Sequence, residues 1–202
     1  MSRVLVVSKT RMRGDHVCVG GHDLDESMRS IRLLQPDGAN MPSDTRFEIG
    51  QVWDLNYELA TAIRPPHVED VFVNSHGARH VDTVQSLGAF LRPRIAVWTG
   101  TMFDGTLLRT NSGTGYVPID DPFPSCSTGY WLSEQPLDFD GDSRYVFRVD
   151  GGRRRIRYVG VAEATVRIEP GTLVRVSLAR AWAPSNAPAG LYLQISGWYV
   201  EC

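Results

Sequence analysis

The sequence predicts a mostly β protein made of two small antiparallel barrels in tandem, with one helix near mid-chain. About ten short segments rich in β-branched and aromatic residues follow one another along the 202 residues. Twelve prolines and nineteen glycines are spread along the chain, which is typical of many turns between short elements. Only one segment has the three- and four-residue apolar spacing of a helix. A chain of this length can bury two small cores.

The first half of the chain contains five candidate strands. They lie at residues 4–8, 17–19, 31–34, 52–59 and 71–73. Residues 52–59 alternate mostly between apolar and polar side chains, which predicts a strand with one buried face. Turn signals such as Pro36-Asp37-Gly38 separate the segments.

The predicted helix covers residues 75–91. Its apolar residues Val81, Val84, Leu87 and Leu91 recur at intervals of three and four, and Pro93 ends the pattern. We expect the boundary between the two barrels here, which gives an N-terminal domain of residues 1–90 and a C-terminal domain of residues 91–202.

The second half returns to short strands. They are predicted at residues 95–98, 107–108, 130–132, 145–149, 155–161, 174–178 and 191–199. Residues 111–129 are rich in Gly, Pro and Ser and are predicted to be a loop.

The charge balance gives no bulk attraction to nucleic acid, because the formal net charge is −2. The 21 basic residues are nevertheless twenty arginines and a single lysine, Lys9. Codon usage in a GC-rich genome accounts for such a bias. Planar arginine side chains also suit phosphates and stacked bases. Composition does not separate these two explanations.

Cysteine usage and the start of the chain indicate a cytoplasmic protein. Cys18, Cys126 and Cys202 are odd in number and widely spaced, which excludes a disulfide framework and fits a reducing compartment. The apolar run Val4–Val7 is too short for a signal peptide or a membrane span. We therefore expect no membrane partner.

Several segments together resemble one known family. They are Val4-Leu5-Val6-Val7-Ser8-Lys9-Thr10 with Cys18-Val19-Gly20-Gly21, Ser30-Ile31-Arg32-Leu33-Leu34, Pro65-Pro66-His67-Val68-Glu69-Asp70, and the ending Val176-Ser177-Leu178-Ala179-Arg180 with Gln194-Ile195-Ser196-Gly197-Trp198-Tyr199. In this order and spacing, over almost the whole chain, they resemble the bacterial dual-OB-containing domain proteins, in which two OB-type barrels follow one another.

The resemblance implies that both barrels are OB-like and that the protein handles nucleic acid. The family is suspected of roles in phage defence, and it carries no catalytic centre over to this chain. OB barrels usually bind oligonucleotides or oligosaccharides across one sheet face. Because a fold does not fix a function, the residues themselves decide which functions remain open.

Two basic segments are candidate phosphate contacts. Lys9, Arg11 and Arg13 follow the first strand, where they form either a phosphate-binding turn or a solvated basic turn; the glycine-rich run of a P-loop is missing. The second segment is Gly151-Gly152-Arg153-Arg154-Arg155-Ile156-Arg157. Strand alternation places Arg155 and Arg157 on one face and Ile156 and Tyr158 on the other. The alternative for these arginines is pairing with Asp138, Asp140 and Asp142.

Catalytic and metal sites have weaker support. His16, Cys18 and His22 lie close together but match no zinc spacing, and Cys18 between two valines is typical of a core residue. The cluster His67, Glu69 and Asp70 is either an acid–base group or a polar loop. No nucleophile elbow is present. We expect no cofactor, no bound metal and, on balance, no enzymatic activity.

The predicted function is therefore non-enzymatic binding of nucleic acid, single-stranded or with an unusual end. The predicted contacts are Lys9, Arg11, Arg13, Arg32, Arg153, Arg154, Arg155 and Arg157, with Tyr130 and Trp131 as an aromatic platform for bases. One alternative is a protein-interaction adaptor in a defence or repair assembly, which the slightly acidic net charge favours. The other is an enzyme acting on nucleotides.

Overall fold

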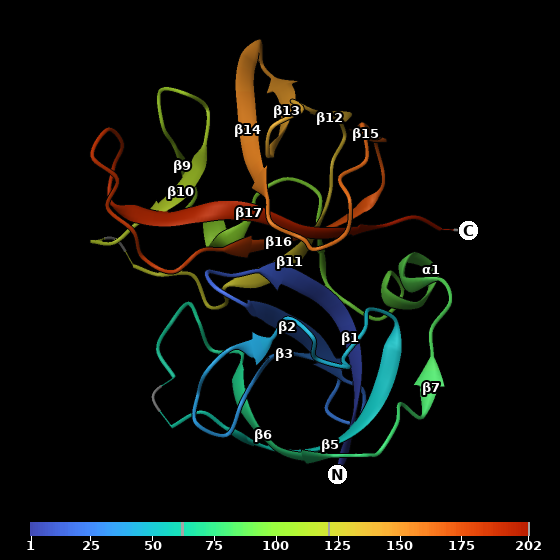
Figure 1. Ribbon diagram of the computed structural model, residues 1–202. Coiled ribbons are helices and arrows are strands. Elements are labelled where there is room, and N and C mark those ends of the chain that lie inside the picture. Colours follow the sequence, from blue (N-terminus) through green and yellow to red (C-terminus); the bar gives the residue numbers. More distant parts are fainter. Residues whose placement is uncertain (62, 121, 202) are drawn as a thin grey trace. The chain divides into compact units, whose positions relative to one another are not determined.

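The computed structural model describes residues 1–61, 63–120 and 122–201 (Figure 1). Strands make up 49% of the chain and helices 4%, which confirms the mostly β fold class. The chain forms two compact units. Unit 1 comprises Met1–Ile95 with Gly160–Ala162 and the chain end from Val200, and unit 2 comprises Ala96–Val159 with Glu163–Tyr199. The division into domains of residues 1–90 and 91–202 stays a prediction.

Both units consist mainly of short strands. Unit 1 contains β1 (Ser2–Arg11), β2 (His16–Asp23), β3 (Arg29–Leu34), β4 (Met41–Pro42), β5 (Gln51–Leu59), β6 (Asp70–His76), β7 (Asp82–Thr83) and the helix α1 (Leu87–Leu91). Unit 2 contains β8 (Val97–Trp98), the 3₁₀ turn η1 (Phe103–Gly105), β9 (Leu108–Arg109), β10 (Gly115–Pro118), β11 (Thr128–Leu132), β12 (Leu137–Phe139), β13 (Arg144–Val149), β14 (Gly152–Tyr158), β15 (Arg167–Ile168), β16 (Leu173–Leu178) and β17 (Gly190–Tyr199).

Unit 1 is a closed five-stranded barrel. Its strands pair in the order β1-β2-β3-β6-β5, and β5 pairs back to β1 (Figure 1). All these pairings are antiparallel except β3–β6, which is parallel. The interior is filled mainly by aliphatic side chains, together with Met41, Phe47 and Trp53; the aliphatic residues include Val4, Val6, Val19, Ile31, Leu33, Leu55 and Val71. The alternation predicted for residues 52–59 holds at Trp53 and Leu55, which are buried, but Val52 on the opposite face is buried as well and Leu59 is exposed.

Unit 2 repeats this connectivity in an open form. Its central strands pair in the order β13-β14-β17-β16-β11, and β14–β17 is parallel, as β3–β6 is in unit 1. β11 and β13 therefore correspond to β1 and β2, but they do not pair with each other among the described residues. The sheet is a curled half-barrel with a seam between β11 and β13. Its core includes Leu137, Tyr145, Ile156, Val174, Val176, Leu193 and Ile195.

The predicted helix is confirmed only at its end. α1 covers Leu87–Leu91 and begins after Ser86, whose side chain caps it, whereas the prediction covered residues 75–91. Upstream of Ser86 the backbone forms strands: β7 pairs with β5, and the Val81 N–H donates to the Val52 carbonyl. Strand pairing to the open side of β5 therefore overrides the helical spacing. The predicted loop at residues 111–129 is likewise wrong over Gly115–Pro118, which pair as β10.

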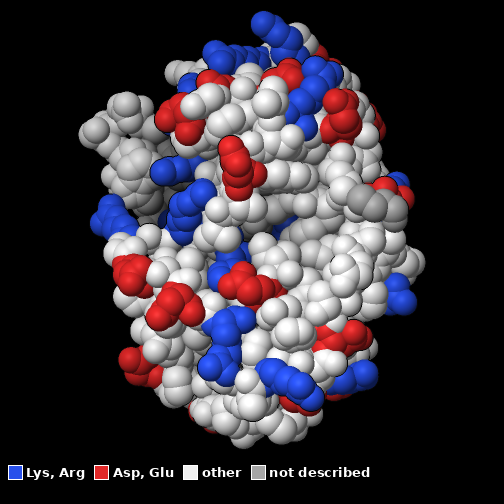
Figure 2. Space-filling model, turned by 45° about the vertical axis from the view of Figure 1, so that its right-hand side comes forward, with Lys and Arg blue, Asp and Glu red and all other residues white. Residues whose placement is uncertain are grey.

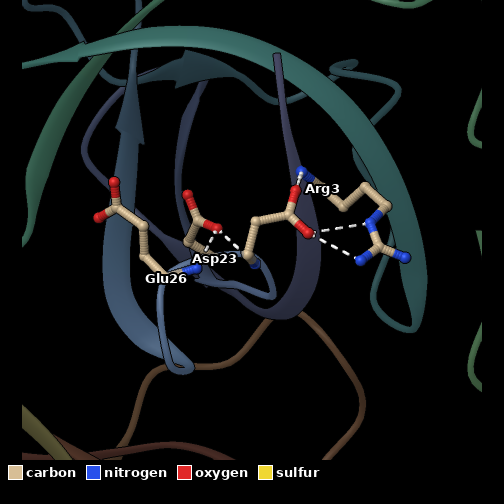
Figure 3. Close-up of polar contacts among 4 residues, drawn as sticks. Arg3, Asp23 and Glu26 are labelled. Carbon is tan, nitrogen blue, oxygen red and sulfur yellow. Dashed lines mark hydrogen bonds and ion pairs between the residues drawn. The ribbon is translucent and has the colours of Figure 1, made fainter.

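A buried carboxylate fixes the turn between β2 and β3 in unit 1. Asp23 is fully buried and accepts hydrogen bonds from the backbone N–H groups of Asp25 at 2.8 Å and Glu26 at 3.0 Å (Figure 3). It also accepts a hydrogen bond from the Tyr57 hydroxyl. Arg3 on β1 pairs with the exposed Asp25 at 2.7 Å. Burial, with the hydrogen bond to Asp23, raises the pKa of Tyr57 to about 12. The sequence analysis did not single out Asp23.

We predict that Asp23→Ala lowers the free energy of unfolding by about 2 kcal/mol, because three donors lose their acceptor. Urea unfolding followed by circular dichroism measures this change. Asp25→Ala is the matched control, since it removes a neighbouring carboxylate whose ion pair is exposed to solvent. Equal losses in the two variants would contradict the role of Asp23.

Candidate nucleic-acid interface

The most basic element of unit 2 is the hairpin of β13 and β14. A two-residue turn, Asp150-Gly151, joins the strands, and both residues have positive φ, 50° and 75°, as a type I′ turn requires. This turn fixes the register, in which Arg148 lies opposite Arg153 and Arg144 opposite Arg157. The sequence 144–157 contains six arginines and a single acidic residue, Asp150.

Alternation divides the hairpin into an apolar inner face and a cationic outer face. Tyr145, Phe147, Ile156 and Tyr158 are buried in the core of unit 2. This burial confirms the predicted face for Ile156 and Tyr158. The opposite face carries five arginines, here called the arginine face: Arg144, Arg148, Arg153, Arg155 and Arg157.

The arginine face is poorly neutralised. Arg144 lies 3.7 Å from Asp142, but no ion pair among the described residues includes the other four arginines. Asp138 instead pairs with Arg167 at 3.1 Å, and Asp140 accepts three backbone N–H groups in its own turn. The predicted alternative of pairing between Arg153–Arg157 and these aspartates is therefore wrong. Figure 2 shows Lys and Arg side chains gathered at the end of unit 2 where β13 and β14 lie in Figure 1, with acidic side chains among them.

An aromatic row lies beside the hairpin. Tyr116 on β10 stacks on Tyr192 of β17, with ring centroids 5.8 Å apart, and Trp182 meets Tyr192 edge-on at 5.7 Å. Trp182, in the loop between β16 and β17, is 60% exposed, whereas Tyr116 is almost fully buried. The Tyr192 hydroxyl donates to the Pro188 carbonyl at 2.6 Å, and its pKa is raised by burial and by Tyr116.

The arginine face and the aromatic row belong to the same side of the sheet. Arg157 of β14 is the register partner of Gln194 on β17, and Gln194 has the same strand parity as Tyr192. Thr114, two residues before Tyr116, forms an isolated parallel β-bridge with Arg155. Partners in a parallel ladder and residues i and i+2 of a strand share one face. Cations and aromatic rings are thus combined on one surface.

Comparison with known proteins identifies the family. A family model described as dual OB-containing domain matches residues 2–198. The chain belongs to the dual-OB-containing domain family. Neither the curated proteins nor the solved structures compared with it include a match. Among the described residues of this dual-OB protein, no helix is both long enough and apolar enough to cross a membrane.

The family assignment gives the arginine face a place in the fold. OB barrels bind ligands over their second and third strands and at the loops between strands 1 and 2 and between strands 4 and 5. In unit 2 of this dual-OB protein those strands are β13 and β14, and the loop between strands 4 and 5 carries Trp182.

The predicted aromatic platform needs correction. Tyr130 and Trp131 are 4% and 7% exposed, so neither ring lies open on the surface. Tyr130 packs near Tyr199 with ring centroids 6.1 Å apart, and burial raises its pKa to about 12. Trp131 belongs to the core and contacts Phe147 at 5.6 Å. An exposed ring is found instead in the aromatic row, where Trp182 is 60% exposed.

Most of the predicted cations in unit 1 have other partners. Lys9 is buried and pairs with Glu48 at 2.8 Å, and Arg32 pairs with Asp70 at 2.5 Å. Arg11 donates to two backbone carbonyl groups of residues 160 and 161. The prediction that these three side chains are free surface cations is therefore corrected. Arg13, exposed in the loop between β1 and β2, stays a predicted contact.

The remaining residue clusters do not converge on a site. His22 is buried, with Nδ1 2.7 Å from the Met28 carbonyl oxygen, while His16 is exposed. His67 and Glu69 are buried. Within the described parts of the chain, no three His, Cys, Asp or Glu side chains are grouped to hold a metal ion.

Sequence reasoning missed Arg144, Arg148, Tyr116 and Tyr192. For the arginines a signal was present: the Asp-Gly turn sets the register, and alternation in residues 144–149 puts Arg144 and Arg148 on the face opposite Tyr145. For the tyrosines no local signal existed, because their contact joins strands that are distant in the sequence.

We predict that Arg153→Gln raises the stability of the protein at low ionic strength by a few tenths of a kcal/mol, because Arg153 faces Arg148 directly across the hairpin. The gain should vanish in about 0.5 M salt, where the repulsion is screened. Thermal unfolding at both salt concentrations measures it. The control is Arg79→Gln, an exposed arginine of unit 1; an equal gain there would contradict the local explanation.

Proposed function

We propose that the protein binds single-stranded nucleic acid over the outer surface of unit 2. The observation that carries this proposal is the combination of the under-neutralised arginine face with the aromatic row on one side of the sheet. Arginines contact phosphates, and exposed rings stack on bases. Membership of the family supports the proposal, because the surface coincides with the one on which OB folds bind oligonucleotides.

The arrangement favours a single strand over a duplex. Bases in a duplex are stacked on each other, so an aromatic side chain reaches a base face only when the strand is unpaired. Trp182 offers the most exposed ring of the row. Because no ion pair of the described residues includes Arg148, Arg153, Arg155 or Arg157, phosphate groups can relieve the repulsion among them.

We predict that binding of labelled single strands is lost steeply as salt rises, and that the double variant Arg153→Gln/Arg157→Gln binds more weakly. Each lost phosphate contact should reduce the slope of log affinity against log salt by about 0.7, so the double variant should lose about 1.4. Fluorescence anisotropy with single- and double-stranded DNA and RNA at several salt concentrations measures both effects.

The matched control for this experiment is Arg64→Gln/Arg79→Gln, two exposed arginines of unit 1 that change the net charge equally. An equal loss in control and test variants would show a non-specific charge effect and overturn the site. If none of the four nucleic acids binds, the function is wrong, and the protein-interaction adaptor becomes the leading alternative. Participation in phage defence or nucleic-acid processing stays a prediction.

A second variant separates stacking from charge. Trp182→Ala should reduce the affinity for single strands by about 1–3 kcal/mol, because one base loses its aromatic contact, while the salt slope stays unchanged. Trp98→Ala is unsuitable as a control because that ring packs on the core. Phe123→Ala, an exposed aromatic residue of unit 2 that is not part of the row, serves instead. Unchanged binding in Trp182→Ala would remove the aromatic row from the proposed site.

A further inference from the structure

A pocket of about 640 Å³ lies at the seam of the half-barrel in unit 2. Trp131 of β11 and Phe147 of β13 both line it, and these two strands do not pair with each other among the described residues. Met102 adds to this apolar wall, and Gln135 offers an amide. The volume lies within the range of roughly 300–1,000 Å³ that is usual for small-molecule sites.

Two arginines from different elements meet in this pocket. Arg109 of β9 and Arg154 of β14 both line it. Burial and the neighbouring charge of Arg154 lower the pKa of Arg109. Arg154 is two residues before the buried Ile156 in the same strand, so it lies on the inner face, opposite Arg153 and Arg155.

The position of Arg109 depends on a glycine. A Cβ atom at Gly115, its partner across β9 and β10, would lie 2.5 Å from the Arg109 Nη1 atom. Nη1 itself is buried and makes no hydrogen bond within the described residues. A buried guanidinium N–H without an acceptor costs free energy, which a bound anion would recover.

No ion pair within the described parts of the chain neutralises the two arginines. Glu134 and Asp150 also line the pocket, yet no ion pair of the described residues joins either of them to Arg109 or Arg154. A cationic pair beside an aromatic wall has the chemistry of a phosphate site next to a base site.

We propose that this pocket binds a nucleoside monophosphate, with the phosphate between Arg109 and Arg154 and the base along the wall of Trp131 and Phe147. Such a group occurs as a free nucleotide or as the phosphorylated terminal nucleotide of a strand. The strand-end form rests on the proposed function, because the strand then lies on the arginine face. The free-nucleotide form does not depend on it.

Calorimetric titration with adenosine and uridine monophosphates tests the pocket directly. We expect the wild-type protein to bind them and Arg154→Gln to lose about tenfold or more in affinity, with a similar loss in Arg109→Gln. Arg79→Gln is the control, because it removes one positive charge from an exposed position of unit 1 that belongs neither to the pocket nor to the arginine face. Thermal unfolding of each variant establishes that it is folded.

Oligonucleotides with 5′-phosphate, 3′-phosphate or hydroxyl ends distinguish the two sources of the ligand. Tighter binding of one phosphorylated end, lost in Arg154→Gln and kept in Arg79→Gln, assigns the pocket to strand ends. Binding of the monophosphates without any effect of the ends assigns it to free nucleotides.

Two results overturn the proposal. One is that the wild-type protein binds no monophosphate and shows no preference for phosphorylated ends. If oligonucleotides still bind through the arginine face, this result contradicts the pocket proposal but not the proposed function. The other is inorganic phosphate binding as tightly as the monophosphates, which would exclude a base-binding role for the aromatic wall.

Discussion

Each unit is organised by one parallel strand pairing, β3 with β6 in unit 1 and β14 with β17 in unit 2. In unit 1 this pairing covers Arg32 to Leu34, and β5 closes the ring by pairing with β1. In unit 2 it covers only Arg157 and Tyr158. Beyond that point β14 leaves β17, and Gly113 and Thr114 lie along its free edge instead. The β13–β14 hairpin therefore extends past the central sheet, and the seam beside it stays open.

The two units differ in whether their basic side chains have carboxylate partners. In the closed barrel Lys9 and Arg32 have carboxylate partners, Glu48 and Asp70, which come from distant parts of the chain. In the hairpin, Arg148 and Arg153 face each other, and no ion pair among the described residues includes either of them. Opposed like charges destabilise a strand pair, whereas the buried inner face and the type I′ turn stabilise the hairpin. The net charge of −2 for the whole chain does not reveal this local excess of positive charge.

Sequence periodicity predicted what is local in this fold. Every segment predicted as a strand overlaps a strand, and alternation placed Ile156 and Tyr158 on the face opposite Arg155 and Arg157, which the structure buries. The failures involve contacts between distant segments. Lys9 looked free because Glu48 lies 39 residues away, and Val81 looked helical because its partner Val52 belongs to another strand.

The candidate site was harder to predict than the fold for the same physical reason. Arginines in one strand are visible as a basic run, but their partners and ring neighbours depend on register and on strand order. Tyr116 and Tyr192 come together only through the pairing of β10 with β17. Tyr130, in contrast, follows a glycine-rich loop and looked exposed, yet the sheet buries it. Burial of a single aromatic side chain depends on what packs over it, which its own segment does not encode.

Arg148 connects the two surfaces of the hairpin. It is part of the arginine face opposite Arg153, and it also lines the seam pocket that contains Arg154. The outer face and the pocket therefore meet at the end of β13, next to the Asp150-Gly151 turn. In the proposed arrangement a strand lying on the arginine face would need to turn only around this end to place its terminal phosphate between Arg109 and Arg154. Adjacent arginines of one strand, Arg153 and Arg154, would then contact different parts of the same ligand because strand alternation separates them.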